Sequence, residues 1–424
     1  MRRISCFLPL LLFTASLALA SSPAAAKAEP AVKVSKAAMD KALAKMVTDG
    51  RVVGASALVW QNGRQVYFGA TGFADREKAK PLTRDAILQI FSMTKPVTGV
   101  ALMQLWEKGL FGLDDPLDRY FPEFAQMQVY AGKDASGAPR YVPASRKITI
   151  RDIMRHTAGF AYGGGDTPAH DAFVKADPLN WNNSLAEAAR KIASVPLLFD
   201  PGIEWSYSAG VDVQAALVEK LSGRPFADYV TQHIFDPLGM KETGWRVPDS
   251  KSDRFAASYE RKGDKLVRVD DVQNRSNNFL PHRLTPGGHG LASTIDDYMR
   301  FARMLLNRGE LDGVRILKRG TVRLMSTNQL DDRVTKTAWL TSKGSVRFGL
   351  DFAVRTKQPQ TPEEPRGAVG EYFWDGAETT QFFIDPANDL AAVLFVQVRP
   401  FDVSLQPRLR AAIYGKDYLG PKGD

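Results

Sequence analysis

The sequence predicts an α+β fold in which an antiparallel sheet, flanked by helices, is built from both ends of the chain around an inserted, mostly helical lobe. Strand-like runs occur near both termini, whereas the middle carries apolar residues at helical spacing and several helix-capping patterns. A sheet to which both ends contribute satisfies this order of elements. We therefore expect an α/β lobe with the sheet over residues 35–115 and 295–424, and a helical lobe over residues 116–294.

The first residues have the pattern of a signal peptide. Arg2 and Arg3 precede a long apolar run, which ends in the small-residue pattern Ala-Leu-Ala that signal peptidase cuts. The sequence predicts a signal peptide over residues 1–20, with an alternative cut after residue 26, and a flexible start over residues 21–34. We therefore expect export to the periplasm or the medium.

Composition excludes several classes of function. The only cysteine, Cys6, lies in the expected signal peptide, so the mature chain is expected to have no disulfide, thiolate metal site or cysteine nucleophile. No later stretch approaches the ~18 continuous apolar residues that a membrane span needs. The net charge of +9 is spread along the chain without a basic block, and we expect no nucleic-acid partner.

The N-terminal elements follow from periodicity and turn residues. A helix is expected over residues 36–48. Strand-like runs at residues 54–60 and 64–68 flank Asn62-Gly63, and Asn-Gly between two such runs favours a tight hairpin turn. The next apolar run, from about Ser92 to Glu107, is expected to form a helix that Gly109 ends.

The middle of the chain shows further helix starts. Capping patterns occur at Thr149-x-x-Asp152, Ser184-x-x-Glu187 and Thr294-x-x-Asp297. Residues 209–221 carry apolar side chains at helical spacing, and Ser222-Gly223 ends that helix.

The end of the chain returns to strands. One strand is expected over residues 348–354. A second hairpin combines residues 381–384 and 390–398 around a turn at residues 385–389, and a helical tail covers residues 407–414.

The chain contains one Ser-x-x-Lys sequence, Ser92 to Lys95, at the start of an apolar helix. Residues three apart lie on one helix face. A serine hydroxyl becomes a good nucleophile when a base takes its proton, and a lysine amine is such a base when burial lowers its pKa. The helix start also favours a developing oxyanion near the backbone N–H of Ser92. The alternative is an ordinary helix cap with a surface lysine nearby.

Other catalytic designs are not supported. Gly-x-Ser-x-Gly, His-Glu-x-x-His and the Gly-rich phosphate loop are absent from the sequence, so we expect no metal and no cofactor. Two further segments are candidates for the site. Tyr207 lies between a turn and a helix, where its hydroxyl can enter a cleft or its ring can pack beneath a loop. Trp374-Asp375-Gly376-Ala377 lies beside a strand, where glycine permits close approach by a ligand or simply a tight strand end.

These motifs occur in the order found in the serine β-lactamase/penicillin-binding-protein superfamily. Segments around them resemble its class C-related branch, which includes family VIII carboxylesterases; they lie at residues 91–98, 150–159, 199–208 and 290–294. The resemblance covers most of residues 35–415 and implies the β-lactamase/DD-peptidase-like fold.

The resemblance also implies roles for individual residues. Ser92 is expected to be the acylated nucleophile, Lys95 and Tyr207 to share the base and acid roles, and the backbone N–H groups of Ser92 and Ala377 to form the oxyanion hole. Substrate-binding residues are expected at Trp374, Asp375, Gly376 and His289. His156 is expected to pack near the site without acting as a base.

Two positions depart from the pattern of penicillin-active members. Ala209 stands where Asn or Ser is usual, and Trp374-Asp375-Gly376 stands where Lys-Thr-Gly is usual, so a substrate-orienting group and a cation are missing. A lysine would pair with a substrate carboxylate, whereas Trp374 offers an apolar wall. A cation from a distant loop remains an alternative.

We therefore expect an exported serine hydrolase that acts through a Ser92 acyl-enzyme on a small-molecule ester or amide. A carboxylesterase on short acyl esters is favoured over a β-lactamase, D-aminopeptidase or DD-peptidase. The alternative of another class is a non-catalytic envelope-binding protein of the same fold. The sequence leaves the oligomeric state open.

Overall fold

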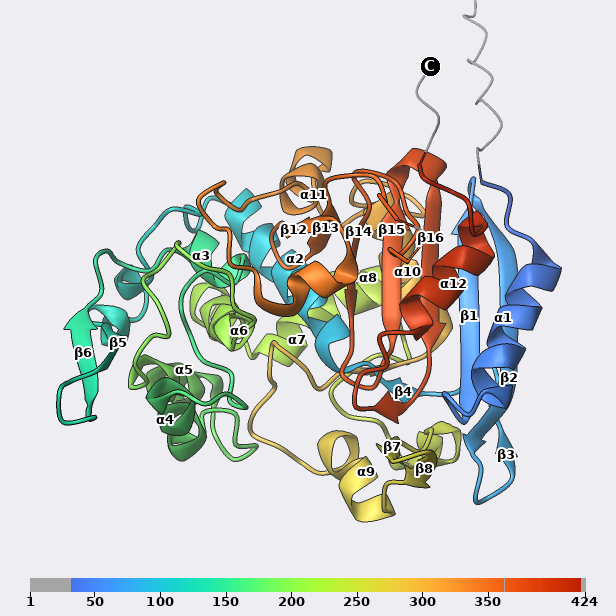
Figure 1. Ribbon diagram of the computed structural model, residues 1–424, viewed down its shortest axis with the longest axis horizontal. Helices are drawn as coiled ribbons and strands as arrows, with labels where there is room; N and C mark the ends of the chain where they lie inside the picture. The colour runs from blue at the N-terminus through green and yellow to red at the C-terminus, as the bar shows by residue number, and fades with distance from the viewer. Residues whose placement is uncertain (1–31, 362, 421–424) are drawn as a thin grey trace, which may run out of the picture. The chain divides into compact units, whose positions relative to one another are not determined.

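The largest sheet that the computed structural model describes, over residues 32–361 and 363–420, is antiparallel and has eight strands (Figure 1). The strands run in the order β12-β13-β14-β15-β16-β1-β2-β3. Their bounds are β1 Gly54–Gln61, β2 Arg64–Asp75, β3 Lys80–Pro81, β12 Val346–Phe348, β13 Ala353–Arg355, β14 Tyr372–Asp375, β15 Gln381–Asp385 and β16 Leu390–Phe395. Because β1 pairs with β16, both chain ends build one sheet, as predicted. The expected signal peptide, residues 1–20, lies outside the described residues.

The first hairpin forms because its turn residues accept left-handed backbone. Asn62 and Gly63 have φ angles of 51° and 76°, and Gln61 pairs with Arg64 across the turn. Such a turn matches the twist of the flanking strands. The predicted hairpin is therefore confirmed, with β2 longer than expected.

Helices cover the sheet and fill the rest of the fold. Helix α10 (Ile295–Leu306) packs against β16, β1 and β15, while α1 (Lys36–Thr48) contacts β2 and α12 (Leu405–Tyr414). The remaining α-helices of four or more residues in the described ranges are α2 Thr94–Glu107, α3 Ile150–Met154, α4 Pro168–Ala176, α5 Leu185–Ala193, α6 Gly210–Ser222, α7 Phe226–Val230, α9 Asp271–Phe279 and α11 Arg319–Met325. The predicted caps Thr149, Ser184 and Thr294 each accept a hydrogen bond from the third residue of their helix.

Helix α2 passes through the interior. Nearly all of its residues are buried, and it packs against α6, so it is apolar on every side instead of amphipathic. This burial places the start of α2, with Lys95 in its first turn and Ser92 just before it, between the sheet and the helices of the middle segment.

One expectation about strands needs correction. Residues 348–354 are not one strand, because Gly349 donates to Phe352 O at 2.8 Å and Asp351 has a φ of 60°, which turns the chain between β12 and β13. A Cβ at residue 349 would lie 2.0 Å from Met325 O, so packing against that carbonyl requires glycine there.

The middle segment also contains hairpins that were not predicted. These are β5 Gln128–Lys133 with β6 Pro139–Pro143, and β7 Tyr259–Lys262 with β8 Lys265–Arg268. The lobe boundaries after residues 115 and 294 stay a prediction. None of the helices within residues 32–361 and 363–420 is both long and apolar enough to span a membrane.

Candidate active site

Ser92 lies in a short 3-10 helix, Phe91–Met93, that leads into α2. Phe91 has a φ of 44°, a left-handed conformation that costs about 1–3 kcal/mol in a bulky residue and is typical of functional sites. Thr94 holds this bend, because its Oγ1 donates to Phe91 O at 2.6 Å and accepts from Leu291 N at 3.3 Å. The bend therefore fixes the direction in which the Ser92 hydroxyl leaves the helix start.

Lys95 lies beside Ser92, as helical spacing predicts. Its Nζ donates to Ser92 Oγ at 3.3 Å and to Gly288 O at 2.6 Å. The ammonium also lies 4.4 Å from the centre of the Tyr207 ring. With 1% of its surface exposed, Lys95 is not the surface lysine of the alternative interpretation.

Burial adjusts the proton affinity of Lys95. Loss of hydration lowers its pKa to about 8, while the carboxylates of Asp212, Asp351 and Asp375 act in the opposite direction. Asp212, on α6, accepts from Gly288 N at 3.0 Å, so the same loop contacts both the lysine and the carboxylate. Lys95 therefore has a substantial neutral fraction near pH 8.

Tyr207 contacts both catalytic candidates. Burial raises the pKa of its phenol well above the ordinary value, and hydrogen bonds with Ser92 and Trp374 act in the opposite direction. Trp374 Nε1 donates to Tyr207 Oη at 3.4 Å. The phenol is therefore protonated at neutral pH and is poised to donate a hydrogen bond.

His156 supports Tyr207 from behind. Its ring centre lies 4.9 Å from that of Tyr207, and its Nδ1 accepts from Ser208 N at 3.3 Å. Burial, together with the charge of Lys95, lowers the pKa of His156 well below 6.5. The ring is therefore a neutral packing group, which matches the role expected from the sequence.

The end of β14 lies against the segment before Ser92. A Cβ at Gly376 would lie 2.2 Å from Thr380 Oγ1 and 2.5 Å from Ile90 O. The groups that approach Gly376 closely are therefore Thr380 and Ile90 of the chain itself. It brings Ala377 to the same pocket as Ser92.

A pocket of about 330 Å³ opens at Ser92. Five of the predicted site residues line it: Ser92, Tyr207, Asp375, Gly376 and Ala377. Three residues without a motif complete the lining: Lys343, Phe401 and Val403. Lys343 Nζ donates to Asp375 Oδ2, so a cation from a distant segment does reach this site.

The other two predicted substrate-binding residues lie elsewhere. Trp374 is buried, packs against Tyr207 with ring centres 5.4 Å apart, and is not among the residues that line the pocket. His289 follows Gly288, the partner of Lys95, and contacts Trp181 with ring centres 5.5 Å apart. Burial lowers the pKa of His289 to about 3, with Lys95 adding to the effect, so its imidazole is neutral.

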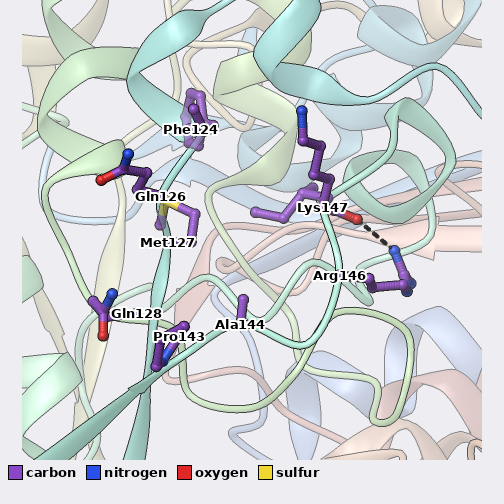
Figure 2. A pocket seen from close by; sticks show the side chains of 10 residues that line it. Phe124, Gln126, Met127, Gln128, Pro143, Ala144, Arg146 and Lys147 are labelled. Carbon is purple, nitrogen blue, oxygen red and sulfur yellow. Dashed lines mark hydrogen bonds between the residues drawn. The ribbon is translucent and has the colours of Figure 1, made fainter.

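A second cavity, of about 350 Å³, lies near the β5–β6 hairpin and is shown in Figure 2. It is lined by residues 124–128, 143, 144 and 146–148, and Arg146 Nη1 donates to Lys147 O there. Its lining contains no serine and no histidine, so it offers no serine nucleophile. Nor do the described ranges, 32–361 and 363–420, hold a cluster of His, Cys, Asp or Glu suited to a metal ion.

Comparison with known proteins gives consistent matches. The family model described as Beta-lactamase matches residues 39–414. Protein Rv1367c of Mycobacterium tuberculosis is 33% identical over 380 residues, covering 87% of this chain and 91% of that protein. Esterase EstB of Burkholderia gladioli is 28% identical over 402 residues, covering 90% and 95%. The solved structure of a mutant simvastatin synthase from Aspergillus terreus has a TM-score of 0.75 at 27% identity, covering 89% and 94%.

Proposed function

Since this chain belongs to the beta-lactamase family and is a serine hydrolase that carries out esterase-type acyl transfer, we propose that Ser92 is its acylated nucleophile and that short acyl esters are its substrates. One observation carries the proposal: Lys95 Nζ lies 3.3 Å from Ser92 Oγ, and Ser92 shares an open pocket with Tyr207 and Ala377. A nucleophile and a base within reach of each other beside a substrate-sized pocket are what acyl transfer requires.

The proton affinities favour Lys95 over Tyr207 as the first base. A neutral Lys95 amine accepts the Ser92 proton as Oγ attacks the ester carbonyl, because the Tyr207 phenol already holds its proton. When the tetrahedral intermediate collapses, the phenol donates to the departing alkoxide and is reprotonated from the Lys95 ammonium. Water then attacks the acyl-enzyme, giving up its proton to this relay, and Ser92 leaves as the restored hydroxyl.

Two backbone N–H groups stabilise the developing oxyanion in this proposal. Ser92 and Ala377 line the same pocket, and Gly376 packs the end of β14 against Ile90. N–H donors that are held in place before the reaction need no rearrangement as charge develops on the carbonyl oxygen. The cost of the strained Phe91 backbone is consistent with this fixed arrangement.

The activity is expected to rise with pH. Below the pKa of about 8 to which burial brings Lys95, the amine is protonated and has no lone pair for the Ser92 proton. The ratio kcat/KM for p-nitrophenyl butyrate should therefore increase as pH rises through that value and then level off. The measurement is a pH–rate profile with circular dichroism at each pH. A profile that is flat across this range would contradict Lys95 as the first base.

The preferred substrate is expected to be an uncharged ester and not a carboxylate-bearing β-lactam. In the sequence, this expectation rests on the absence of a lysine from the strand motif. In the structure, Lys343 lies in the pocket instead and pairs with Asp375. The pocket thus has a cation whose charge a neighbouring carboxylate offsets, beside the apolar walls of Phe401 and Val403.

The test compares kcat/KM for p-nitrophenyl butyrate, nitrocefin and a D-alanyl amide on the same purified protein. We expect the ester to exceed nitrocefin by about 10- to 150-fold, the range of one charge-assisted hydrogen bond. A ratio well below one would favour a β-lactamase, and preference for the D-alanyl amide would favour a peptidase.

We also propose export to the periplasm or the medium. The support is the basic, then apolar, then small-residue pattern of residues 1–20.

A further inference from the structure

We propose that the ion pair between Lys343 and Asp375 sets the charge selectivity of the pocket at Ser92, favouring uncharged esters over esters that carry a positive or negative group. The inference rests on the proposed esterase function and adds a class of substrate to it. Lys343 and Asp375 both line the pocket that holds Ser92 and Tyr207. They come from different parts of the chain, a 3-10 helix at residues 338–343 and the end of β14.

The pair lies where its charges would act on a bound substrate. The side chains of Lys343 and Asp375 are 6% and 10% exposed, so water screens their charges little. Lys343 Nζ lies 4.9 Å from the ring centre of Phe401, another residue of the lining. A charged substrate group in this pocket would meet either charge at short range.

Stability alone gives a weak reason for such a pair. Two charges taken out of water lose hydration, and apolar residues of similar size often replace a buried ion pair without loss of stability. A pair in the wall of a reaction pocket is therefore better explained by its effect on the substrate. With both charges present the wall is close to neutral, and this favours an uncharged ester.

The Asp375 carboxylate also acts on the groups of the relay. Its charge raises the pKa of both Lys95 and Tyr207. Because Lys343 is paired with this carboxylate, it offsets a negative potential at the nucleophile as well as at the substrate. The pair therefore affects both which substrates bind and the proton affinities of Lys95 and Tyr207.

Two variants change the charge of the wall by design, and a third keeps it neutral. Asp375→Asn leaves a positive wall, Lys343→Met leaves a negative wall, and the double variant is neutral without the ion pair. Lys336→Met is the matched control, since Lys336 is an exposed lysine close by in the chain that pairs with Glu204. Thermal melts establish that each variant is folded, and the double variant leaves neither charge buried without its partner.

The measurement is kcat/KM for p-nitrophenyl butyrate, for two analogues with a carboxylate on the acyl chain or on the leaving group, and for analogues with trimethylammonium at the same places. Asp375→Asn should raise the anionic-to-neutral ratio by about tenfold or more for at least one carboxylate position. Lys343→Met should lower that ratio and raise the cationic-to-neutral ratio. The double variant and Lys336→Met should keep ratios near those of the wild type.

The outcomes separate this inference from the proposed function. If the wild type hydrolyses the neutral ester but no variant changes either ratio, the charge-selectivity inference is wrong and the esterase stands. Equal losses on all esters would also overturn it, because a purely structural pair affects every substrate alike. If the wild type hydrolyses none of the esters, the proposed function fails, and the inference fails with it.

Discussion

Ser92→Ala is expected to lower ester hydrolysis by about 10,000-fold or more while leaving the fold intact, because no other group can accept the acyl chain. The Ser92 hydroxyl contacts Lys95 and Tyr207, two groups of the relay. It does not cap α2, whose N-cap residue is Met93 without a side-chain hydrogen bond. The substitution therefore removes the nucleophile without the usual cost of about 1 kcal/mol for a lost cap.

The measurement is kcat/KM for p-nitrophenyl butyrate, with a thermal melt of each variant. Ser136→Ala is a matched control, since Ser136 lies between β5 and β6, where it contacts Asp134. Activity of folded Ser92→Ala within a few-fold of the wild type would contradict the assignment. An inactive wild type would instead favour the non-catalytic binding protein.

Lys95→Ala and Tyr207→Phe are each expected to lower kcat by about a thousandfold or more, and the double variant should be little worse than either single variant. The reason is that Lys95, Tyr207 and Ser92 are in mutual contact and pass one proton among them. Residues that act as one unit have strongly non-additive effects, because removing one member disables the others.

The measurement is a double-mutant cycle in kcat on p-nitrophenyl butyrate. Lys95→Met accompanies Lys95→Ala, because methionine fills the buried space and separates loss of the base from the cost of a cavity. Tyr207→Phe keeps the ring contacts with His156 and Trp374. Two effects that simply multiply in the double variant would show that Lys95 and Tyr207 do not belong to one relay.

The parts of the fold that depend on local sequence were predicted well. The bounds of α1, the caps of α3, α5 and α10 and the turn at Asn62-Gly63 agree with the structure, since each depends on residues within a few positions. The β7–β8 hairpin was not predicted although it has a local signal, since Gly263-Asp264 is a two-residue turn between short strands.

Long-range contacts explain what the sequence could not predict. Residues 348–354 are apolar enough for one strand, but the approach of Met325 O to Gly349 turns the chain there. In the site, Ser92 and Lys95 follow from helical spacing, whereas Tyr207 and Ala377 depended on the family resemblance. Lys343 belongs to no motif, and only the folded chain places it beside Asp375.

The central claim is that Ser92 carries the acyl group, and a mechanism-based label tests it most directly. Wild-type protein is treated with an alkyl fluorophosphonate, whose serine adduct resists hydrolysis, and the modified peptide is sequenced by mass spectrometry. The account predicts one adduct, on Ser92, formed in step with loss of esterase activity and absent from folded Ser92→Ala. An adduct on another residue, or full loss of activity with Ser92 unmodified, would contradict it.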